Sequence, residues 1–459
     1  MKQIDKLLKE VKKIHFIGIG GSGMCPIAEI LHNQGYQLTG SDNNETDTLN
    51  RIKSLGIPVH MGHSKDNIGD AEMVIYTAAI MSDNEELIYA KEHVPTFERS
   101  VMLGALSRMF KNCIGICGTH GKTTVTSMTT QALIMAGLDP SAVIGGKLPL
   151  INSNGRIGKS ENFVCESCEF KDTFLEMDPD VAVILNVDAD HLEYFKTLDN
   201  IKKSFNKFAS NATKAVIYNG DDQNTLDSIK GITGKEMISF GYGDGNDYVA
   251  KNVVFNGGFK SSFDVYHNGE FIANVKLSVP GKHNILNGLA AFVASVYAGA
   301  DAQKVAQALE EFKGAGRRFE LLAEIDGITI ADDYAHHPAE LKVTLEAAMN
   351  MGYNNVWAVF QPFTYSRTAM LLDDFAEVLK IPDKCVMSEI MGSREKNTYN
   401  IYTKDLAEKI PGSVWFNTFE EIAKYVTDNA QKGDLIITLG CGDIYKAAKM
   451  MIKILNEKK

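Results

Sequence analysis

Short apolar runs alternate with longer amphipathic segments along most of the chain. The first apolar run, residues 14–19, leads into a glycine-rich turn, and a helix-compatible segment over residues 24–34 precedes a second strand-like run that ends at residue 42. Apolar runs of about four to eight residues bounded by turn residues are typical of buried strands. The chain is therefore expected to begin with a β-α-β unit.

The same alternation of apolar runs and amphipathic segments continues to the C-terminus. A second series of strands and helices begins near residue 113. Further strands are predicted at residues 72–76, 113–117, 162–165, 181–187, 215–218, 328–331, 356–360, 384–388 and 435–439, and a strand-rich stretch at 248–279. Helices are predicted at residues 84–92, 125–136, 284–298 and 373–379. Strands alternating with helices predict parallel sheets, and the length suits three domains, over residues 1–107, 108–314 and 315–459.

Composition narrows the classes of partner. The chain has 459 residues and a formal net charge of -11, which offers no general attraction to nucleic acid or to anionic membrane surfaces. No apolar stretch approaches the length of a membrane helix, and glycines interrupt the first apolar run, which excludes a signal peptide. We expect a cytoplasmic protein with small-molecule partners, no nucleic acid and no membrane, and the pattern leaves its oligomeric state open.

Cysteine usage argues against disulfides and metal clusters. The seven cysteines are few for this length and odd in number. Only Cys165-x-x-Cys168 has a suggestive spacing, and a second such pair with metal-ligand spacing is missing. Reduced thiols are the expectation.

The first glycine-rich turn has the spacing of a dinucleotide fingerprint. Gly18-x-Gly20-x-x-Gly23 follows a predicted strand and opens a predicted helix, and Asp42 follows after about 20 residues. The glycines let the backbone approach a pyrophosphate, whose charge the free N–H groups of the helix start complement. The turn alone does not distinguish NAD, FAD and a UDP-sugar, which present the same diphosphate.

A second phosphate loop follows the strand at residues 113–117. Ile116 stands where the strict P-loop pattern has its first glycine, but the end that binds phosphate is present as Gly121-Lys122-Thr123. Lys122 can reach the β- and γ-phosphates of a nucleotide, and the Thr123 hydroxyl can hold Mg²⁺. An oxidoreductase has no need of the second loop and a simple ATPase has no need of the first, whereas a ligase needs both.

Seven ordered motifs make the sequence similar to the Mur ligase family, the ATP-dependent ligases that add amino acids or peptides to UDP-N-acetylmuramic acid. The motifs are His15-Phe16-Ile17-Gly18-Ile19-Gly20-Gly21, Gly118-Thr119-His120-Gly121-Lys122-Thr123-Thr124, Asn186-x-x-x-Asp190-His191, Pro280-Gly281-x-His283-Asn284-x-x-Asn287, Gly316-Arg317-Arg318-Phe319, Asp332-Asp333-Tyr334-Ala335-His336-His337-Pro338 and Gln361-Pro362-x-x-x-x-Arg367-Thr368. The resemblance implies an N-terminal Rossmann-like domain for the UDP-sugar, a central P-loop-type ATPase domain and a C-terminal Rossmann-like domain for the amino acid.

The resemblance also implies roles for individual residues. The UDP-sugar would contact Gly18, Gly20, Gly21, Ser22, Gly23, Ser41 and Asp42. ATP would contact Gly118, Thr119, His120, Gly121, Lys122, Thr123, Thr124, Asn284, Asn287, Arg318 and Asp333. Two Mg²⁺ ions would be held by Thr123, Glu169 and His191, and the amino acid by Tyr334, His336 and Arg367. The catalytic group would be Lys122, Glu169, His191, His336 and Arg367.

The implied reaction is ATP-dependent ligation of L-alanine to the lactoyl carboxylate of UDP-N-acetylmuramate through an acyl phosphate, in peptidoglycan precursor synthesis. The alternative within the family is the recycling ligase that attaches a tripeptide to the same sugar. Outside it, an NAD-dependent enzyme and a nucleotide-binding regulatory protein remain as rivals.

Two departures from the family pattern bear on these expectations. Cys168 and Lys171 stand where many members have acidic residues, which leaves metal affinity open. Phe363-Thr364 replaces a common His-Arg pair, which leaves amino-acid specificity open.

Overall fold

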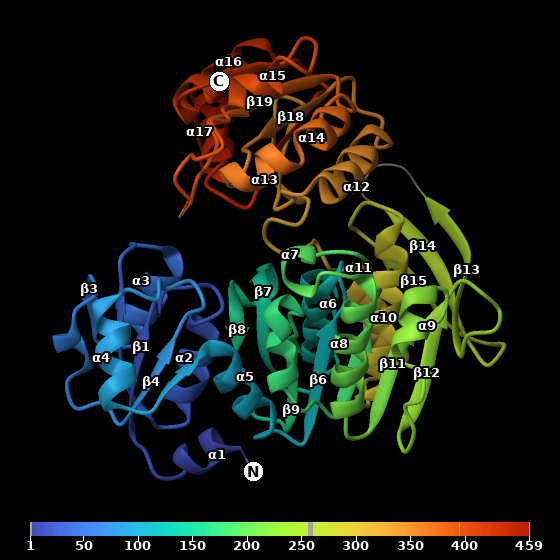
Figure 1. Cartoon of the computed structure of the whole chain (residues 1–459). Helices are drawn as coiled ribbons and strands as arrows, with labels where there is room; N and C mark the ends of the chain where they lie inside the picture. Colours follow the sequence, from blue (N-terminus) through green and yellow to red (C-terminus); the bar gives the residue numbers. More distant parts are fainter. Residues whose placement is uncertain (1, 256–259, 394, 459) are drawn as a thin grey trace. The chain divides into compact units, whose positions relative to one another are not determined.

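The computed structural model describes residues 2–255, 260–393 and 395–458, and within them the backbone forms three sheets (Figure 1). The chain divides into two compact units, the first of residues 1–253, 263–276 and 286–312, the second of residues 254–262, 277–285 and 313–459. The predicted α/β class with parallel sheets is confirmed. The domain boundaries near residues 107 and 314 stay predictions.

The first sheet is parallel throughout. Its strands lie side by side in the order β3-β2-β1-β4-β5. In chain order they are β1 (Lys13–Ile17), β2 (Gln37–Asp42), β3 (Val59–Met61), β4 (Met73–Tyr76) and β5 (Thr96–Glu98). Its helical segments are α1 (Gln3–Leu7), α2 (Cys25–Asn33), α3 (Asp47–Ser54), η1 (Lys65–Ile68), α4 (Glu85–His93) and α5 (Arg99–Ser107). Because β1 is central, the loop that follows it lies in the middle of the sheet's carboxyl edge.

The second sheet has the order β15-β14-β13-β12-β11-β10-β6-β9-β7-β8. Its strands are β6 (Asn112–Cys117), β7 (Ser141–Leu148), β8 (Ser153–Arg156), β9 (Asn162–Glu166), β10 (Val181–Ile184), β11 (Ala215–Asn219), β12 (Glu236–Gly241), β13 (Tyr248–Phe255), β14 (Ser261–His267) and β15 (Glu270–Leu277). Its helical segments are α6 (Lys122–Met135), η2 (Pro149–Ile151), η3 (Phe170–Glu176), α7 (Leu192–Phe195), α8 (Leu198–Asn211), α9 (Gln223–Ser228), α10 (His283–Tyr297) and α11 (Ala302–Glu310).

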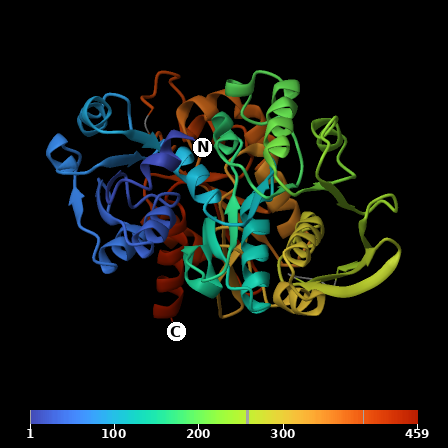
Figure 2. The same ribbon diagram turned by 90° about the horizontal axis from the view of Figure 1, so that it is seen from below.

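The interior of this sheet is parallel and carries the second loop. β6 pairs in parallel with β9 on one side and β10 on the other. The strand predicted over 181–187 is too long, because after Ile184 the backbone turns to meet that loop, where the Asn186 carbonyl accepts from the Thr119 N–H at 3.1 Å. The stretch predicted to be strand-rich forms β13, β14 and β15, at the outer edge of the sheet in Figures 1 and 2, and its residues 256–259 lie outside the described residues.

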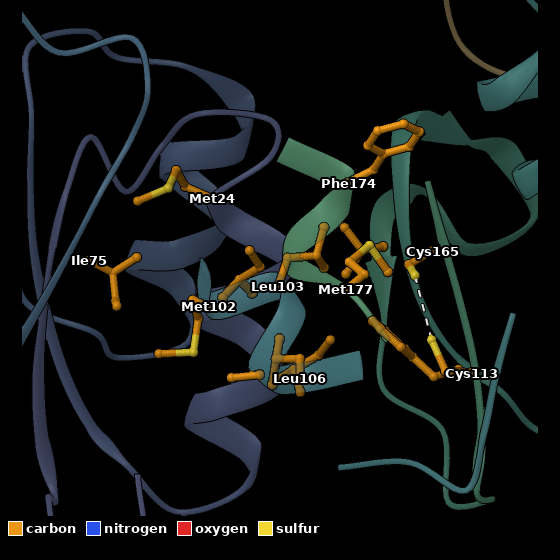
Figure 3. Close-up of a cluster of buried hydrophobic side chains, with 14 of the residues drawn as sticks. Met24, Ile75, Met102, Leu103, Leu106, Cys113, Cys165, Phe174 and Met177 are labelled. Carbon is orange, nitrogen blue, oxygen red and sulfur yellow. Dashed lines mark hydrogen bonds between the residues drawn. The ribbon is translucent and has the colours of Figure 1, made fainter. Parts of the chain in front are cut away.

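One apolar core runs from the elements of the first sheet into those of the second. Met102, Leu103 and Leu106 of α5 lie between Ile75 of β4 and Phe174 and Met177, which follow β9 (Figure 3). The approach is close, since a Cβ atom added to Gly104 would lie 2.1 Å from the Glu176 carbonyl oxygen. Burial of large apolar side chains stabilises such a junction by about 25 cal/mol per Å² of area removed from water.

The third sheet has the order β16-β17-β21-β18-β19-β20, with only the edge strand β16 antiparallel. Its strands are β16 (Glu320–Ile325), β17 (Ile328–Asp333), β18 (Val356–Phe360), β19 (Lys384–Ser388), β20 (Val414–Phe416) and β21 (Leu435–Leu439). Its helices are α12 (Pro338–Met349), α13 (Tyr365–Met370), α14 (Leu372–Val378), α15 (Thr403–Ala407), α16 (Phe419–Asn429) and α17 (Tyr445–Glu457).

Two expectations from composition can be compared with the structure. All seven cysteines carry free thiols, and the sulfur nearest to Cys165 is that of Cys113 on the neighbouring strand, at 3.9 Å. Among the described residues, no helix is long and apolar enough to span a bilayer.

Candidate functional site

The first glycine loop connects β1 to α2 and is held from β2. The Ser41 carbonyl accepts hydrogen bonds from the N–H groups of Gly18, at 2.8 Å, and Ile19, at 3.1 Å. The Asp42 carboxylate accepts from the N–H of Gly20 at 2.9 Å. Gly18 has a φ of +81°, and a Cβ there would lie 2.5 Å from the Thr77 side chain. The structure therefore brings Ser41 and Asp42, both predicted for the UDP-sugar, to the loop.

The remaining residues of this loop face two other elements. The side-chain amide of Asn154, from β8, donates to the Ser22 carbonyl. A Cβ on Gly23 would lie 3.2 Å from the Arg99 side chain. Asn154 and Arg99 were not predicted from the sequence, because neither lies in a motif.

A buried polar network behind the loop was also missed. The carboxylate of Glu86, in the first turn of α4, contacts His15, His63 and Ser41 within 3 Å. Only Ser41 was a predicted site residue. A buried carboxylate in a sequence looks like any other glutamate, so no local signal identifies it.

The second loop connects β6 to α6, and its lysine folds back over it. Lys122 Nζ donates to the carbonyl oxygens of Gly118, at 2.6 Å, and Thr119, at 3.1 Å. Gly121 has a φ of +88°, and a Cβ there would lie 2.5 Å from Asn287 Oδ1. Asn287 of α10, one of the two asparagines predicted to contact ATP, therefore lies against this loop.

The segment after β10 supports the loop from its other side. The side chain of Asn186 accepts from the N–H of His120 at 2.8 Å and donates to its carbonyl at 3.1 Å. The N–H of Asp188 donates to the Thr119 hydroxyl at 2.8 Å. These bonds bring the segment leading to His191 beside the phosphate loop.

Lys122 and Glu169 form a buried ion pair. Lys122 Nζ lies 2.9 Å from both carboxylate oxygens and donates a hydrogen bond to Oε1. Burial opposes the charge on Lys122, but the Glu169 carboxylate outweighs it and raises the pKa of the lysine above its usual range. Burial and the same carboxylate raise the pKa of the Cys168 thiol, which keeps Cys168 a neutral thiol.

The predicted metal ligands have suitable atoms but do not form a closed cluster. Among the described residues, Glu169 Oε2 is buried and accepts no hydrogen bond, and no group of three or more His, Cys, Asp or Glu side chains could hold an ion. Thr123 is buried in the first turn of α6. His191 has a φ of +52° before α7, and its ring centroid lies 4.7 Å from that of Phe170. Carboxylate and hydroxyl oxygens suit Mg²⁺, with nucleotide phosphates completing its shell.

In the second unit, Asp333 lies at the carboxyl end of β17. Its carboxylate accepts from the N–H groups of Phe319, at 2.7 Å, and Ala335, at 2.8 Å. Burial raises the pKa of Asp333 to about 6, although Arg318 and these N–H groups oppose the rise. In the same unit, the side chain of Asn284 donates to the Pro280 carbonyl at 2.6 Å.

The residues predicted for the amino acid gather near this strand end. The guanidinium of Arg318 lies 5.2 Å from the Tyr334 ring centroid, and the rings of Tyr334 and His336 are 5.5 Å apart. His336 Nδ1 lies 3.2 Å from Glu340, whereas His337 caps α12, so the two histidines are not joint metal ligands.

Arg367, in the first turns of α13, has an unusual environment. Among the described residues, its Nη1 atom is buried and donates no hydrogen bond. A buried guanidinium nitrogen without an acceptor is costly, so the arrangement suits an anionic ligand that supplies one.

Arg317 was missed as a residue that shapes the same end of the sheet. Its guanidinium donates to Asp332 at 2.9 Å and to the Gly442 carbonyl at 3.1 Å, and it lies 5.0 Å from the Tyr334 ring centroid. Arg317 and Arg318 are adjacent and look equivalent in the sequence. Only the folded structure shows that they have different partners.

Comparison with known proteins gives consistent matches over the chain. Models of Mur ligase domains match residues 13–111 (Mur ligase family, catalytic domain), 116–295 (Mur ligase middle domain) and 317–442 (Mur ligase, glutamate ligase domain). The UDP-N-acetylmuramate–L-alanine ligase of Caldanaerobacter subterraneus subsp. tengcongensis is 42% identical, over 98% of this chain and 99% of that protein. The enzyme of the same name from Clostridium acetobutylicum is 43% identical, over 96% and 97%.

Solved structures of Mur ligases also match this chain. The UDP-N-acetylmuramate–alanine ligase of Thermotoga maritima is 28% identical, with a TM-score of 0.83 over 97% of this chain and 100% of that one. A murein peptide ligase of Psychrobacter arcticus is 22% identical, with a TM-score of 0.74 over 97% and 98%, and shows the shared fold.

Proposed function

Because the chain belongs to the Mur ligase family, we propose that it joins L-alanine to the lactoyl carboxylate of UDP-N-acetylmuramate at the expense of ATP. The observation that carries this proposal is the 42% identity, over nearly the whole chain, to relatives named for that reaction. The proposal includes an acyl-phosphate intermediate and a role in peptidoglycan precursor synthesis.

The first loop is proposed to hold the diphosphate of the UDP-sugar. Its N–H groups and glycine backbone suit a diphosphate. The Asp42 carboxylate accepts from the N–H of Gly20, so it helps to set the shape of the loop. A nicotinamide cofactor is not needed for a ligase, and the NAD-dependent alternative loses its support.

The second loop is proposed to hold the ATP phosphates. Lys122 would exchange its carbonyl and Glu169 partners for phosphate oxygens, and it would offset their charge as the sugar carboxylate attacks the γ-phosphorus. Thr123, Glu169 and His191 would hold Mg²⁺, which supplies positive charge that screens the two anionic reactants. These roles are supported by the burial of the Glu169 carboxylate, whose Oε2 accepts no hydrogen bond from the described residues, and by its ion pair with Lys122.

The second unit is proposed to deliver the amino acid. Arg367 would hold the α-carboxylate of L-alanine through its buried Nη1, with Tyr334 and His336 nearby on the carboxyl side of the sheet. The amine then attacks the acyl carbon, an amide bond forms, and phosphate leaves.

Phosphate release tests the proposal directly. The assay combines UDP-N-acetylmuramate, ATP and Mg²⁺ with L-alanine, glycine, L-serine or L-Ala-γ-D-Glu-meso-diaminopimelate. Release should require the sugar and be fastest with L-alanine, and ¹⁸O placed in the sugar carboxylate should appear in the released phosphate. Product formed without ¹⁸O transfer contradicts the acyl-phosphate route.

The same assay decides between family members. The recycling alternative has weaker support, because the curated relatives at 42% identity over nearly the whole chain are named for the L-alanine reaction. Turnover with the tripeptide and none with L-alanine would favour the recycling reaction. A nucleotide-binding regulatory protein would release no phosphate with any acceptor.

A further inference from the structure

Glu86 is a buried carboxylate whose partners come from three separate segments. It lies in the first turn of α4, and its side chain is 0% exposed. Its Oε1 atom is 2.9 Å from His15 Nε2 of β1. Its Oε2 atom is 2.7 Å from Ser41 Oγ of β2 and 2.7 Å from His63 Nδ1, two residues after β3. A buried charge needs such a set of donors, and here the set is complete.

The carboxylate fixes the proton positions of its neighbours. An ionised carboxylate only accepts hydrogen bonds, so His15 must carry a proton on Nε2 and His63 a proton on Nδ1. His15 Nδ1 forms a hydrogen bond with the Thr39 hydroxyl at 2.8 Å. Burial alone would raise the pKa of Glu86, but the hydrogen bonds from His15, Ser41 and His63 outweigh it and lower that pKa. Glu86 is thus an anion in the folded protein.

Ser41 connects this network to the first glycine loop. Its hydroxyl donates to Glu86, while its backbone carbonyl accepts from the N–H groups of Gly18 and Ile19. The side chain of Ser41 is therefore fixed by the Glu86 carboxylate, and its backbone carbonyl is fixed by the loop. A displaced Ser41 would move the carbonyl oxygen that holds the N–H groups of Gly18 and Ile19.

We propose that Glu86 is a positioning residue of the UDP-sugar site, which acts through Ser41 to hold the first glycine loop in its binding conformation. The proposal rests on the function proposed above, because it takes the UDP-sugar as the ligand of this loop. Glu86 itself touches no substrate. Its effect is on the affinity for the sugar nucleotide and not on the chemistry at the second loop.

The primary test is Glu86→Gln, which keeps the size of the side chain and removes its charge. A glutamine amide keeps one acceptor oxygen but places an NH2 group where the other carboxylate oxygen stood. That group meets neighbours that are themselves donors, so the hydrogen bonds on at least one side of the network are lost. By calorimetry, the Kd for UDP-N-acetylmuramate should rise about tenfold or more. The KM for ATP and kcat at saturating sugar should stay near those of the wild type.

Glu85→Gln is the matched control. Glu85 precedes Glu86 on the same helix turn but is exposed. It carries the same formal charge, so a general change in the field of the protein would appear in both variants. Its Kd for the sugar nucleotide should match that of the wild type.

A double-variant cycle tests the connection through Ser41. If Glu86 acts through the Ser41 hydroxyl, Ser41→Ala should weaken binding as well, and the double variant should bind no more weakly than Glu86→Gln. Losses that multiply would overturn the proposed connection. A folded Glu86→Gln with unchanged Kd would overturn the positioning role.

Folding and the proposed function are separated by further measurements. If Glu86→Gln does not fold, Thr39→Val replaces it, because this nearly isosteric change removes the hydroxyl that is hydrogen-bonded to His15 at the far end of the network. Thr39→Val should then raise the Kd about threefold, and an unchanged Kd would overturn the proposal. Wild-type protein that does not bind UDP-N-acetylmuramate would instead contradict the proposed function.

Discussion

The ammonium group of Lys122 is paired with the carboxylate of Glu169, although the two residues are expected to serve different partners. Their side chains are 14% and 3% exposed, so the pair is screened little by water. In this pair each charge stabilises the other. When ATP and a metal ion bind, the phosphates would replace Glu169 as the partner of Lys122, and the metal ion would replace Lys122 as the partner of Glu169. Neither charge would then be left buried without a partner.

Glu169→Gln should separate the two roles of this carboxylate. The amide oxygen can still accept from Lys122, so folding should survive, but the anion that Mg²⁺ prefers is lost. We expect turnover to fall by about 10²-fold or more, measured as phosphate release across a Mg²⁺ titration.

Glu161→Gln serves as the control for that variant. Glu161 pairs with Lys111 on the surface, where the loss of an ion pair has little effect. Near-normal turnover of Glu169→Gln at low Mg²⁺ would show that the metal carboxylate lies elsewhere, with Glu166 the next candidate.

Gly121→Ala should damage nucleotide binding more than a comparable glycine change. Gly121 and Gly137 have φ values of +88° and +83°, so alanine meets a similar backbone cost of about 1 kcal/mol at both. Only at Gly121 does the new Cβ meet a neighbour, Asn287 Oδ1 at 2.5 Å, whereas nothing lies within 4 Å at Gly137. The Kd for ATP should rise about tenfold or more for Gly121→Ala alone. Equal affinities in the two variants would show that contact with Asn287 is unimportant.

Arg367→Lys should change the affinity for L-alanine selectively. The substitution keeps the positive charge but loses the planar group that can hold a carboxylate with two parallel hydrogen bonds. The KM for L-alanine should rise well beyond those for ATP and UDP-sugar in steady-state assays. Lys380→Met, which removes an exposed partner of Glu377, is the control. An equal rise in all three constants would mean that Arg367 has a structural role.

Asp333 should make the stability of the second unit depend on pH. Its pKa is about 6 in the folded chain against an ordinary value of 3.8, so the folded state binds the proton more tightly. The resulting stabilisation is complete below the ordinary value and is lost as the pH rises to about 6. The free energy of unfolding should lose up to about 3 kcal/mol over that window.

Denaturant unfolding at about pH 4 and about pH 7 measures this effect. Asp333→Asn cannot titrate, so its free energy of unfolding should fall less between the two conditions than that of the wild type. Asp374→Asn, at an exposed position, should retain the wild-type difference. Identical pH dependence in wild type and Asp333→Asn would contradict the raised pKa.

The sequence by itself determined the elements whose signals are local. β18, β19 and β21 occupy the residues predicted for them, because a continuous apolar run between turn residues describes a strand buried on both faces. Both glycine loops were also predicted, since the positive φ values of Gly18 and Gly121 are conformations that glycine adopts without strain. The pattern of apolar positions and the spacing of glycines involve residues that are close together in the chain. Both can therefore be recognised in the sequence without the tertiary structure.

Only the tertiary structure decided which distant side chains meet. Glu169 was predicted through a family resemblance, but its contact with Lys122 depends on β9 and β6 lying side by side. Glu86 and His63 gave no sequence signal, because their importance arises from burial and from partners on other segments. A pairing energy depends on distance and on the exclusion of water, and neither is set until the sheets and helices have packed.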